Sequence, residues 1–198
     1  MASTQPSQTQ TQTPPHEQHL RLALDKKDLG NAAFRNAEIN QAIRYYHESV
    51  LYLLTMVQPK TSASGSGAPN MADMAAASAQ SAIPKPVLAE AKANLIAVYS
   101  NLAACHTKNA RWDRVLDCCT KALSLDQDHV KSLYRKGLAL ARMNRTDQAV
   151  KQLRRALELA PNDANIIKEL HACKQKEREQ VEKQKRDMAG MFERGSLF

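Results

Sequence analysis

Two cations in the stretch VKSLYRKGLAL, Lys131 and Arg135, stand four positions apart, a spacing that places them on one face of a helix. No acidic residue lies within four positions of them on that face, apart from Asp128 just before the stretch. Like charges at this spacing destabilise an isolated helix by about 0.2–0.5 kcal/mol. Small residues follow at Gly137 and Ala139, which favours close packing of the same helix. Such a pair is compatible with a solvated helix face, which is the usual case, or with counter-ions that come from another molecule.

Three further hydrogen-bond donors lie upstream in comparable settings. Lys27 and Asn31 stand four apart in LDKKDLGNAAF, and Asn101 lies in VYSNLAACH. Ammonium, guanidinium and amide groups all donate hydrogen bonds to carboxylates, and the charge-assisted bonds contribute about 1.5–3 kcal/mol each where water is limited. These residue types predict recognition of an anionic ligand, provided that the fold brings them together.

The histidines do not form a catalytic set. His47, His106, His129 and His171 are scattered, with no acid or nucleophile at partner spacing, and the chain has no glycine-rich phosphate loop. We therefore expect no catalytic residues and no enzymatic activity.

The composition predicts one helical domain. Of the 198 residues, 43% are hydrophobic but only 5% are aromatic, and alternating runs of Val, Ile and Thr are absent. No run approaches the roughly 18 apolar residues of a membrane-spanning helix. The first residues have neither the basic start nor the apolar core of a secretory signal. We expect no membrane association.

The cysteines are expected to be reduced residues of the core. Cys118 and Cys119 are adjacent, no C-x-x-C pair occurs, and Cys105 and Cys173 also lie in periodic apolar contexts. This pattern predicts neither a metal site nor a cofactor, and it indicates the cytoplasm or the nucleus as the location.

The charge distribution favours an acidic partner. The formal net charge is +8, and residues 96–163 hold 12 Lys and Arg against 7 Asp and Glu. Nucleic acid is disfavoured because aromatic side chains that could stack on bases are scarce.

A repeat organises the chain. Several residues recur 34 positions on, as the same or a similar type: Ala122, Leu123 and Leu125 match Ala156, Leu157 and Leu159, and Ala103 matches Gly137. This period, with small residues at fixed positions, resembles the tetratricopeptide repeat (TPR), a helix–turn–helix unit. The resemblance implies an all-α, right-handed superhelix of three repeats and a long C-terminal capping helix.

The repeat frame divides the chain into segments. Gln, Thr and Pro dominate the first residues, which we expect to be disordered, and a segment rich in Ser, Ala, Gly and Pro is expected to form a flexible insertion, with a helical turn near 71–81. The predicted segments are a tail over 1–16 and a TPR domain over 17–194, the latter comprising repeat one at about 20–57, the insertion at 58–86, repeat two at about 87–129, repeat three at about 130–163 and the capping helix at about 164–194.

The five donors resemble the two-carboxylate clamp of TPR co-chaperones. That family's pattern is Lys-x-x-x-Asn, then an Asn-Leu-Ala type motif, then Lys-x-x-x-Arg, matched by Lys27, Asn31, Asn101, Lys131 and Arg135. The resemblance implies an acidic Glu-Glu-Val-Asp tail of a cytosolic 90-kDa or 70-kDa heat-shock chaperone as the partner. It also implies that the first three residues hold the terminal carboxylate pair, while Lys131 and Arg135 contact the Asp side chain and groups upstream.

The run from YSNLAACH to KALSLD, which includes Cys118–Cys119, and the tail RDMAGMFER resemble the TPR region of the large FK506-binding immunophilins. Small tetratricopeptide-repeat-9-type proteins share this layout. Residues 1–19 are too few for a prolyl-isomerase domain, so isomerase activity is not expected.

Other interpretations stay open. The segment 164–194 has 8 Lys and Arg against 6 Asp and Glu, a mixture that favours a solvated helix over nucleic-acid or membrane binding. Met188, Met191 and Phe192 could anchor a calmodulin-type partner or simply pack at the helix end. A TPR scaffold that binds a different partner, with the clamp unused, is the alternative function. We expect a monomer.

Overall fold

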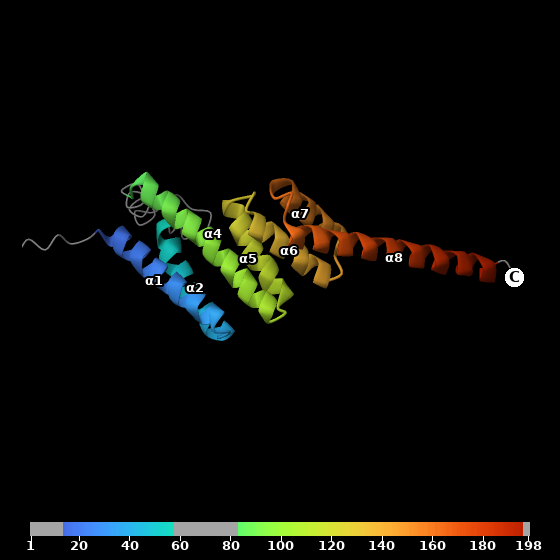
Figure 1. The fold of residues 1–198 in the computed structure, drawn as a ribbon, viewed down its shortest axis with the longest axis horizontal. Helices are drawn as coiled ribbons and strands as arrows, with labels where there is room; N and C mark the ends of the chain where they lie inside the picture. The colour runs from blue at the N-terminus through green and yellow to red at the C-terminus, as the bar shows by residue number, and fades with distance from the viewer. Residues whose placement is uncertain (1–13, 58–82, 196–198) are drawn as a thin grey trace, which may run out of the picture.

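The computed structural model describes residues 14–57 and 83–195 (Figure 1). The predicted tail as far as residue 13 and the predicted insertion over 58–82 lie outside the described residues. All regular secondary structure in the described ranges is helical: α1 (Pro15–Arg35), α2 (Ile39–Val57), α4 (Lys85–Lys108), α5 (Trp112–Leu125), α6 (Val130–Arg142), α7 (Thr146–Leu159) and α8 (Ala164–Gly195).

The helices pair along the chain and the pairs stack on one another. α1 packs on α2, α4 on α5, and α6 on α7, while α2 with α4, α5 with α6, and α7 with α8 join successive pairs. The pairs therefore follow one another along the long axis of the molecule, and α8 extends beyond them (Figure 1).

Two helices begin earlier than the predicted segments because proline starts them. α1 begins at Pro15, so Pro15 and His16 belong to the helix and not to the predicted tail. α4 begins at Lys85, so Lys85 and Pro86 are helical although the sequence placed them in the insertion. Proline is compatible with the first helical turn, where its missing N–H has no intrahelical partner.

The three turns inside the helix pairs share one backbone geometry. Ala37, Ala110 and Asn144 have φ values of 62°, 52° and 61°. The following residue in each turn donates its N–H to a carbonyl of the preceding helix, at 2.9–3.0 Å. The same turn therefore recurs in all three pairs, and its copies at Ala110 and Asn144 are separated by the repeat period of 34 residues.

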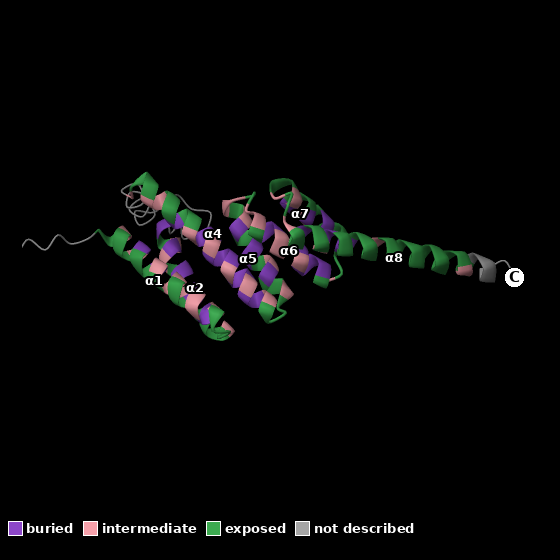
Figure 2. Cartoon of the chain, in the orientation of Figure 1, coloured by how far each residue is buried: buried purple, intermediate pink, exposed green. Residues whose placement is uncertain are grey.

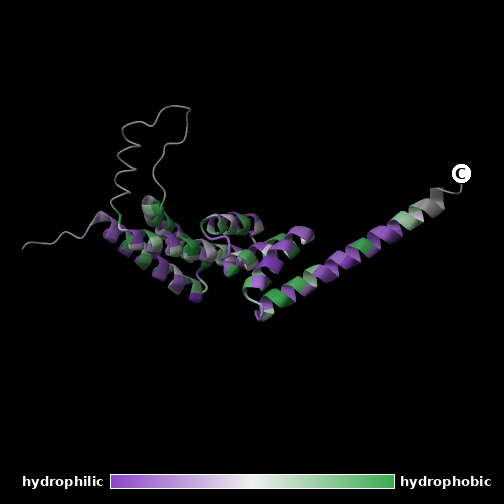
Figure 3. Ribbon diagram, turned by 90° about the horizontal axis from the view of Figure 1, so that it is seen from above, coloured by the Kyte–Doolittle hydropathy of each residue, from purple (hydrophilic) through white to green (hydrophobic). Residues whose placement is uncertain are grey.

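Small and aliphatic side chains form the core between the helices, with the exposed residues outside (Figure 2). Ile166, Leu170 and Cys173 of α8 are buried and cover the last pair. From residue 174 onward the described side chains of α8 are almost all exposed. This part of α8 projects away from the repeats and is mostly hydrophilic (Figure 3).

In the described parts of the chain, no helix has the length and apolar character needed to cross a bilayer.

Candidate functional site

A pocket of about 240 Å³ opens between the first helices of the three pairs. Its lining residues come from α1, α2, α4 and α6: Asn31, Phe34, Arg35, Tyr46, Asn101, Ala104 and Arg135. Three of the five residues predicted from the sequence, Asn31, Asn101 and Arg135, therefore line one cavity.

Asn31 is held by two donors from neighbouring helices. Its Oδ1 accepts hydrogen bonds from the Tyr46 hydroxyl at 2.8 Å and from Asn101 Nδ2 at 3.1 Å. Its Nδ2 donates only a long bond, 3.4 Å, to Asp28 Oδ1. Because the oxygen is occupied, the amide N–H groups of Asn31 are the part left to meet a ligand.

Tyr46 lines the pocket and supports this network. Its side chain is buried, and burial raises the pKa of its hydroxyl to about 12. The hydroxyl therefore stays protonated at neutral pH and acts as the donor to Asn31.

Arg135 is the partly buried charge of the pocket. Its Nη1 donates to the buried Ser100 Oγ at 2.5 Å. Burial lowers the pKa of the guanidinium, and the Cys119 and Cys105 thiols lie near enough to influence it. Among the described residues no carboxylate forms an ion pair with Arg135, so this desolvated cation lacks a counter-charge.

The two predicted lysines lie outside the pocket. Lys27 donates from Nζ to Asn94 Oδ1 on α4 at 2.7 Å, which ties α1 to α4. Lys131 is exposed, one helical turn before Arg135. Asp128, the acid closest to Lys131 in the sequence, instead pairs with Arg155 at 2.8 Å.

Sequence reasoning missed several residues of the site. Arg35 lies four positions after Asn31, so the Lys27–Asn31 spacing, continued by one more turn, would have found it. Nothing in the sequence marked Tyr46, Ser100 or Asn94 as partners, because these contacts depend on how neighbouring helices pack.

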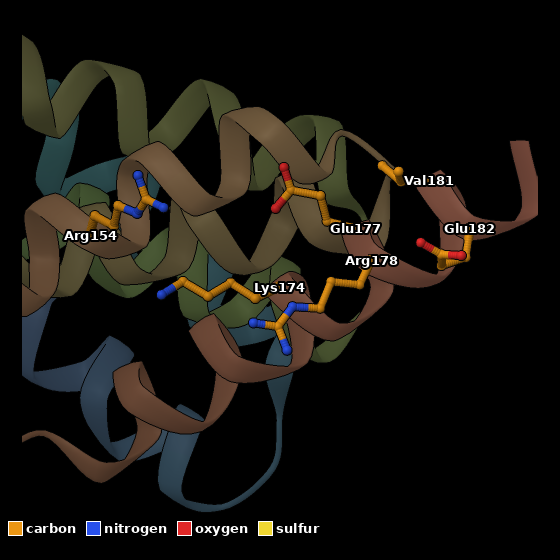
Figure 4. A pocket seen from close by; sticks show the side chains of 6 residues that line it. All are labelled: Arg154, Lys174, Glu177, Arg178, Val181 and Glu182. Atoms are coloured by element: carbon orange, nitrogen blue, oxygen red, sulfur yellow. The ribbon is translucent and has the colours of Figure 1, made fainter. Parts of the chain in front are cut away.

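A second hollow, of about 450 Å³, lies where α8 leaves the last pair (Figure 4). It is lined by Arg154, Lys174, Glu177, Arg178, Val181 and Glu182. Its three cations lie beside two carboxylates, so its charge is nearly balanced, and no amide donor lines it. The first pocket is the better candidate for an anionic ligand.

Comparison with models of known protein families identifies repeats in the chain. Models of the tetratricopeptide repeat match residues 98–130 and 130–163. These matches identify two tetratricopeptide repeats within residues 98–163. The helical architecture of the described residues confirms the predicted fold class, an all-α right-handed TPR superhelix.

The sequence of the chain is also similar to that of a known larger protein. The chain is 29% identical over 178 residues to the peptidyl-prolyl cis-trans isomerase FKBP4 of Bos taurus, a match that covers 90% of this chain and 34% of that protein. The chain thus spans about a third of the length of that relative. The predicted resemblance to the TPR region of FK506-binding immunophilins is confirmed.

Two solved structures show the same arrangement of helices. The C-terminal TPR-containing domain of a putative Plasmodium falciparum FK506-binding protein aligns with a TM-score of 0.67 and 26% identity, over 85% of this chain and 97% of that one. The first TPR domain of Spaghetti (RPAP3), bound to the HSP90 peptide SRMEEVD, aligns with a TM-score of 0.56 and 20% identity, over 79% and 93%.

Proposed function

We propose that this chain is a non-catalytic cytoplasmic adaptor, a co-chaperone. Its TPR groove would bind the acidic C-terminal Glu-Glu-Val-Asp tail of a 90-kDa or 70-kDa heat-shock chaperone. The observation that supports this proposal most directly is the pocket in which Asn31, Asn101 and Arg135 converge, where no described carboxylate pairs with the arginine. The peptide-bound RPAP3 structure supports a tail peptide as the kind of ligand that this fold accommodates.

The pocket explains how such a tail would be recognised. Asn31 and Asn101 present amide N–H groups whose orientation is fixed by the bonds to Asn31 Oδ1. Arg135 supplies a planar, partly desolvated cation that can bind a carboxylate through two parallel hydrogen bonds. Lys27 and Lys131, one turn before Asn31 and Arg135, add charge beside the pocket for acidic groups nearby.

Affinity is expected to be moderate. Ordering a flexible tail costs several kcal/mol of the gross interaction energy, which brings a five-donor site to a Kd on the order of micromolar. Because charges dominate the contact, affinity should fall as salt rises.

Fluorescence polarisation with labelled Ser-Arg-Met-Glu-Glu-Val-Asp tests the proposal. Truncating one member of a buried charge pair commonly costs about 2–5 kcal/mol, so Arg135→Ala should weaken binding by at least about 30-fold. Lys131→Ala should weaken it by less, about 3- to 10-fold, because Lys131 is exposed.

Arg114→Ala is the matched control. Arg114 lies on α5 outside the pocket, and its ion pair with Asp117 is long, at 3.9 Å, so its loss should leave affinity unchanged. Circular dichroism would confirm that Arg135→Ala is folded, and Arg135→Lys would retain the charge without the planar fork. Equal binding by wild type and Arg135→Ala, or no effect of amidating the peptide's C-terminus, would contradict the proposal and favour a scaffold for a different partner.

A further inference from the structure

Arg35 is a cation of the pocket that the clamp resemblance does not include. It occupies the last position of α1, four residues after Asn31, and lines the same cavity as Asn101 and Arg135. It is exposed, and its positive charge acts on the Tyr46 hydroxyl, which lines the same pocket. In residues 14–57 and 83–195, no carboxylate forms an ion pair with it.

A basic residue in the last turn of a helix has an ordinary explanation, because it interacts favourably with the helix dipole. α4 and α6 carry Lys108 and Arg142 at the same place in their repeats. Their surroundings nevertheless differ from that of Arg35. Arg142 pairs with Glu169 at 3.2 Å, and Lys108 is not among the residues that line the pocket. The dipole accounts for the residue type at all three positions but not for the cavity beside Arg35.

Two guanidinium groups and no carboxylate line this pocket. A ligand residue with one negative charge would leave one of the two cations uncompensated, whereas a C-terminal aspartate brings a main-chain and a side-chain carboxylate on one residue. Lys27 is already bonded to Asn94, and Lys131 does not line the cavity. The two arginines are therefore the pocket's own counter-ions for a doubly charged residue.

We propose that Arg35 and Arg135 together select a C-terminal residue with two carboxylates, Arg35 binding one of them and Arg135 the other. This inference rests on the proposed binding of an acidic tail, and it names Arg35 as the residue that sets specificity for the last position.

The test uses the full chain with three labelled peptides. The first is Ser-Arg-Met-Glu-Glu-Val-Asp with a free C-terminus, the second ends in Asn with a free C-terminus, and the third ends in Asp-amide. Each of the last two lacks one terminal carboxylate charge. Arg35→Gln should weaken the first peptide by about 10-fold or more, the effect of one charge-assisted hydrogen bond. The same substitution should weaken one of the other two by no more than about 2-fold, because the carboxylate that Arg35 binds is then missing.

Lys108→Gln is the matched control, with the same change of charge at the same repeat position. It should change the affinity of each peptide by less than about 2-fold. Arg35→Lys keeps the charge without the planar fork and should give an intermediate loss on the first peptide. Circular dichroism and the urea midpoint would verify that each variant is folded.

The outcomes separate this inference from the proposed function. No loss in Arg35→Gln, or an equal loss with all three peptides, overturns the role of Arg35, because a general positive field would act on all three alike. If Arg135→Ala still loses the first peptide in that case, the proposed function stands without this inference. A wild-type chain that binds none of the peptides overturns both.

Discussion

At the scale of single residues, Tyr46 joins the core to the pocket. Its ring packs closely on Gly30, and its hydroxyl donates to Asn31. A free amide can rotate so that either end faces a ligand, but here Tyr46 and Asn101 both donate to the oxygen end. The nitrogen end of Asn31 is therefore directed to the ligand before any ligand arrives, which lowers the cost of binding.

Tyr46→Phe should keep the packing and remove one of these two donors. We expect the free energy of unfolding to fall by about 1 kcal/mol and affinity for the acidic peptide to fall several-fold. Urea denaturation and fluorescence polarisation would measure the two effects.

Tyr45→Phe provides a neighbouring control. Tyr45 is half-buried, and its hydroxyl accepts a bond from Gln41 at 3.1 Å without lining the pocket. Its loss should leave affinity unchanged. If the two variants bind the peptide equally well, the Tyr46 hydroxyl does not direct the amide nitrogen of Asn31 to the ligand.

The sequence predicted part of this site because helical spacing fixes which face a residue occupies. Asn31, Asn101 and Arg135 were found in this way, since repeat-equivalent or four-residue spacing brings them to one groove. The bond from Lys27 to Asn94 could not be predicted, because helical spacing does not specify which side chain lies opposite on the next helix.

At the scale of elements, the two helices of a pair approach closely because the sizes of two facing residues, one on each helix, are matched. A Cβ added at Gly30 would lie 2.6 Å from Tyr46 Cε1, and one added at Gly137 would lie 2.7 Å from Leu153 Cγ. In the second pair the equivalent residues are Ala103 and the smaller Cys119, both fully buried. Glycine thus faces a large side chain in the first and third pairs, and alanine occurs with a small side chain in the second pair.

Gly137→Ala should therefore overpack the α6–α7 pair and lower the free energy of unfolding by about 1–3 kcal/mol. Adding Leu153→Cys recreates the combination found in the second pair, so the double variant should be more stable than the sum of the two single changes predicts. Urea midpoints of the four proteins give this coupling. Strictly additive effects would show that the two positions do not compensate each other.

The elements themselves were the most predictable feature. The 34-residue period gave the helix pairs, because each repeat must bury the same small and aliphatic positions against its neighbours. α1 and α4 begin inside the segments whose composition predicted a tail and an insertion, because proline is compatible with the first turn of a helix.

At the scale of the whole molecule, α8 closes the stack of repeats. A repeat contacts only its neighbours, so the last pair would expose an apolar face without a covering helix. Ile166 of α8 is 1% exposed and packs in a cluster with Leu133 and Ala156, whereas the adjacent Ile167 is 46% exposed. The resemblance to the repeat implied a capping helix over about 164–194, and Ile166, Leu170 and Cys173 are the residues of α8 that are buried in it.

The two isoleucines offer a matched comparison. Ile166→Ala should lower the free energy of unfolding by about 2–5 kcal/mol, because it leaves a cavity under the cap. Ile167→Ala should change it by less than about 0.5 kcal/mol, as expected of surface substitutions. Chemical denaturation of both variants measures the difference, and similar losses would mean that α8 does not hold the array closed through this face.

The four buried cysteines can report where the stack of repeats opens. Cys105, Cys118 and Cys119 lie in the second helix pair and Cys173 lies on the buried face of the capping helix α8, all shielded from solvent. Burial also raises the pKa of each thiol, so the reactive thiolate is scarce while the repeats stay closed. A thiol reagent can therefore modify these residues only when a repeat separates from its neighbour. The order in which the cysteines react then tells whether the stack frays from its cap or parts in its middle.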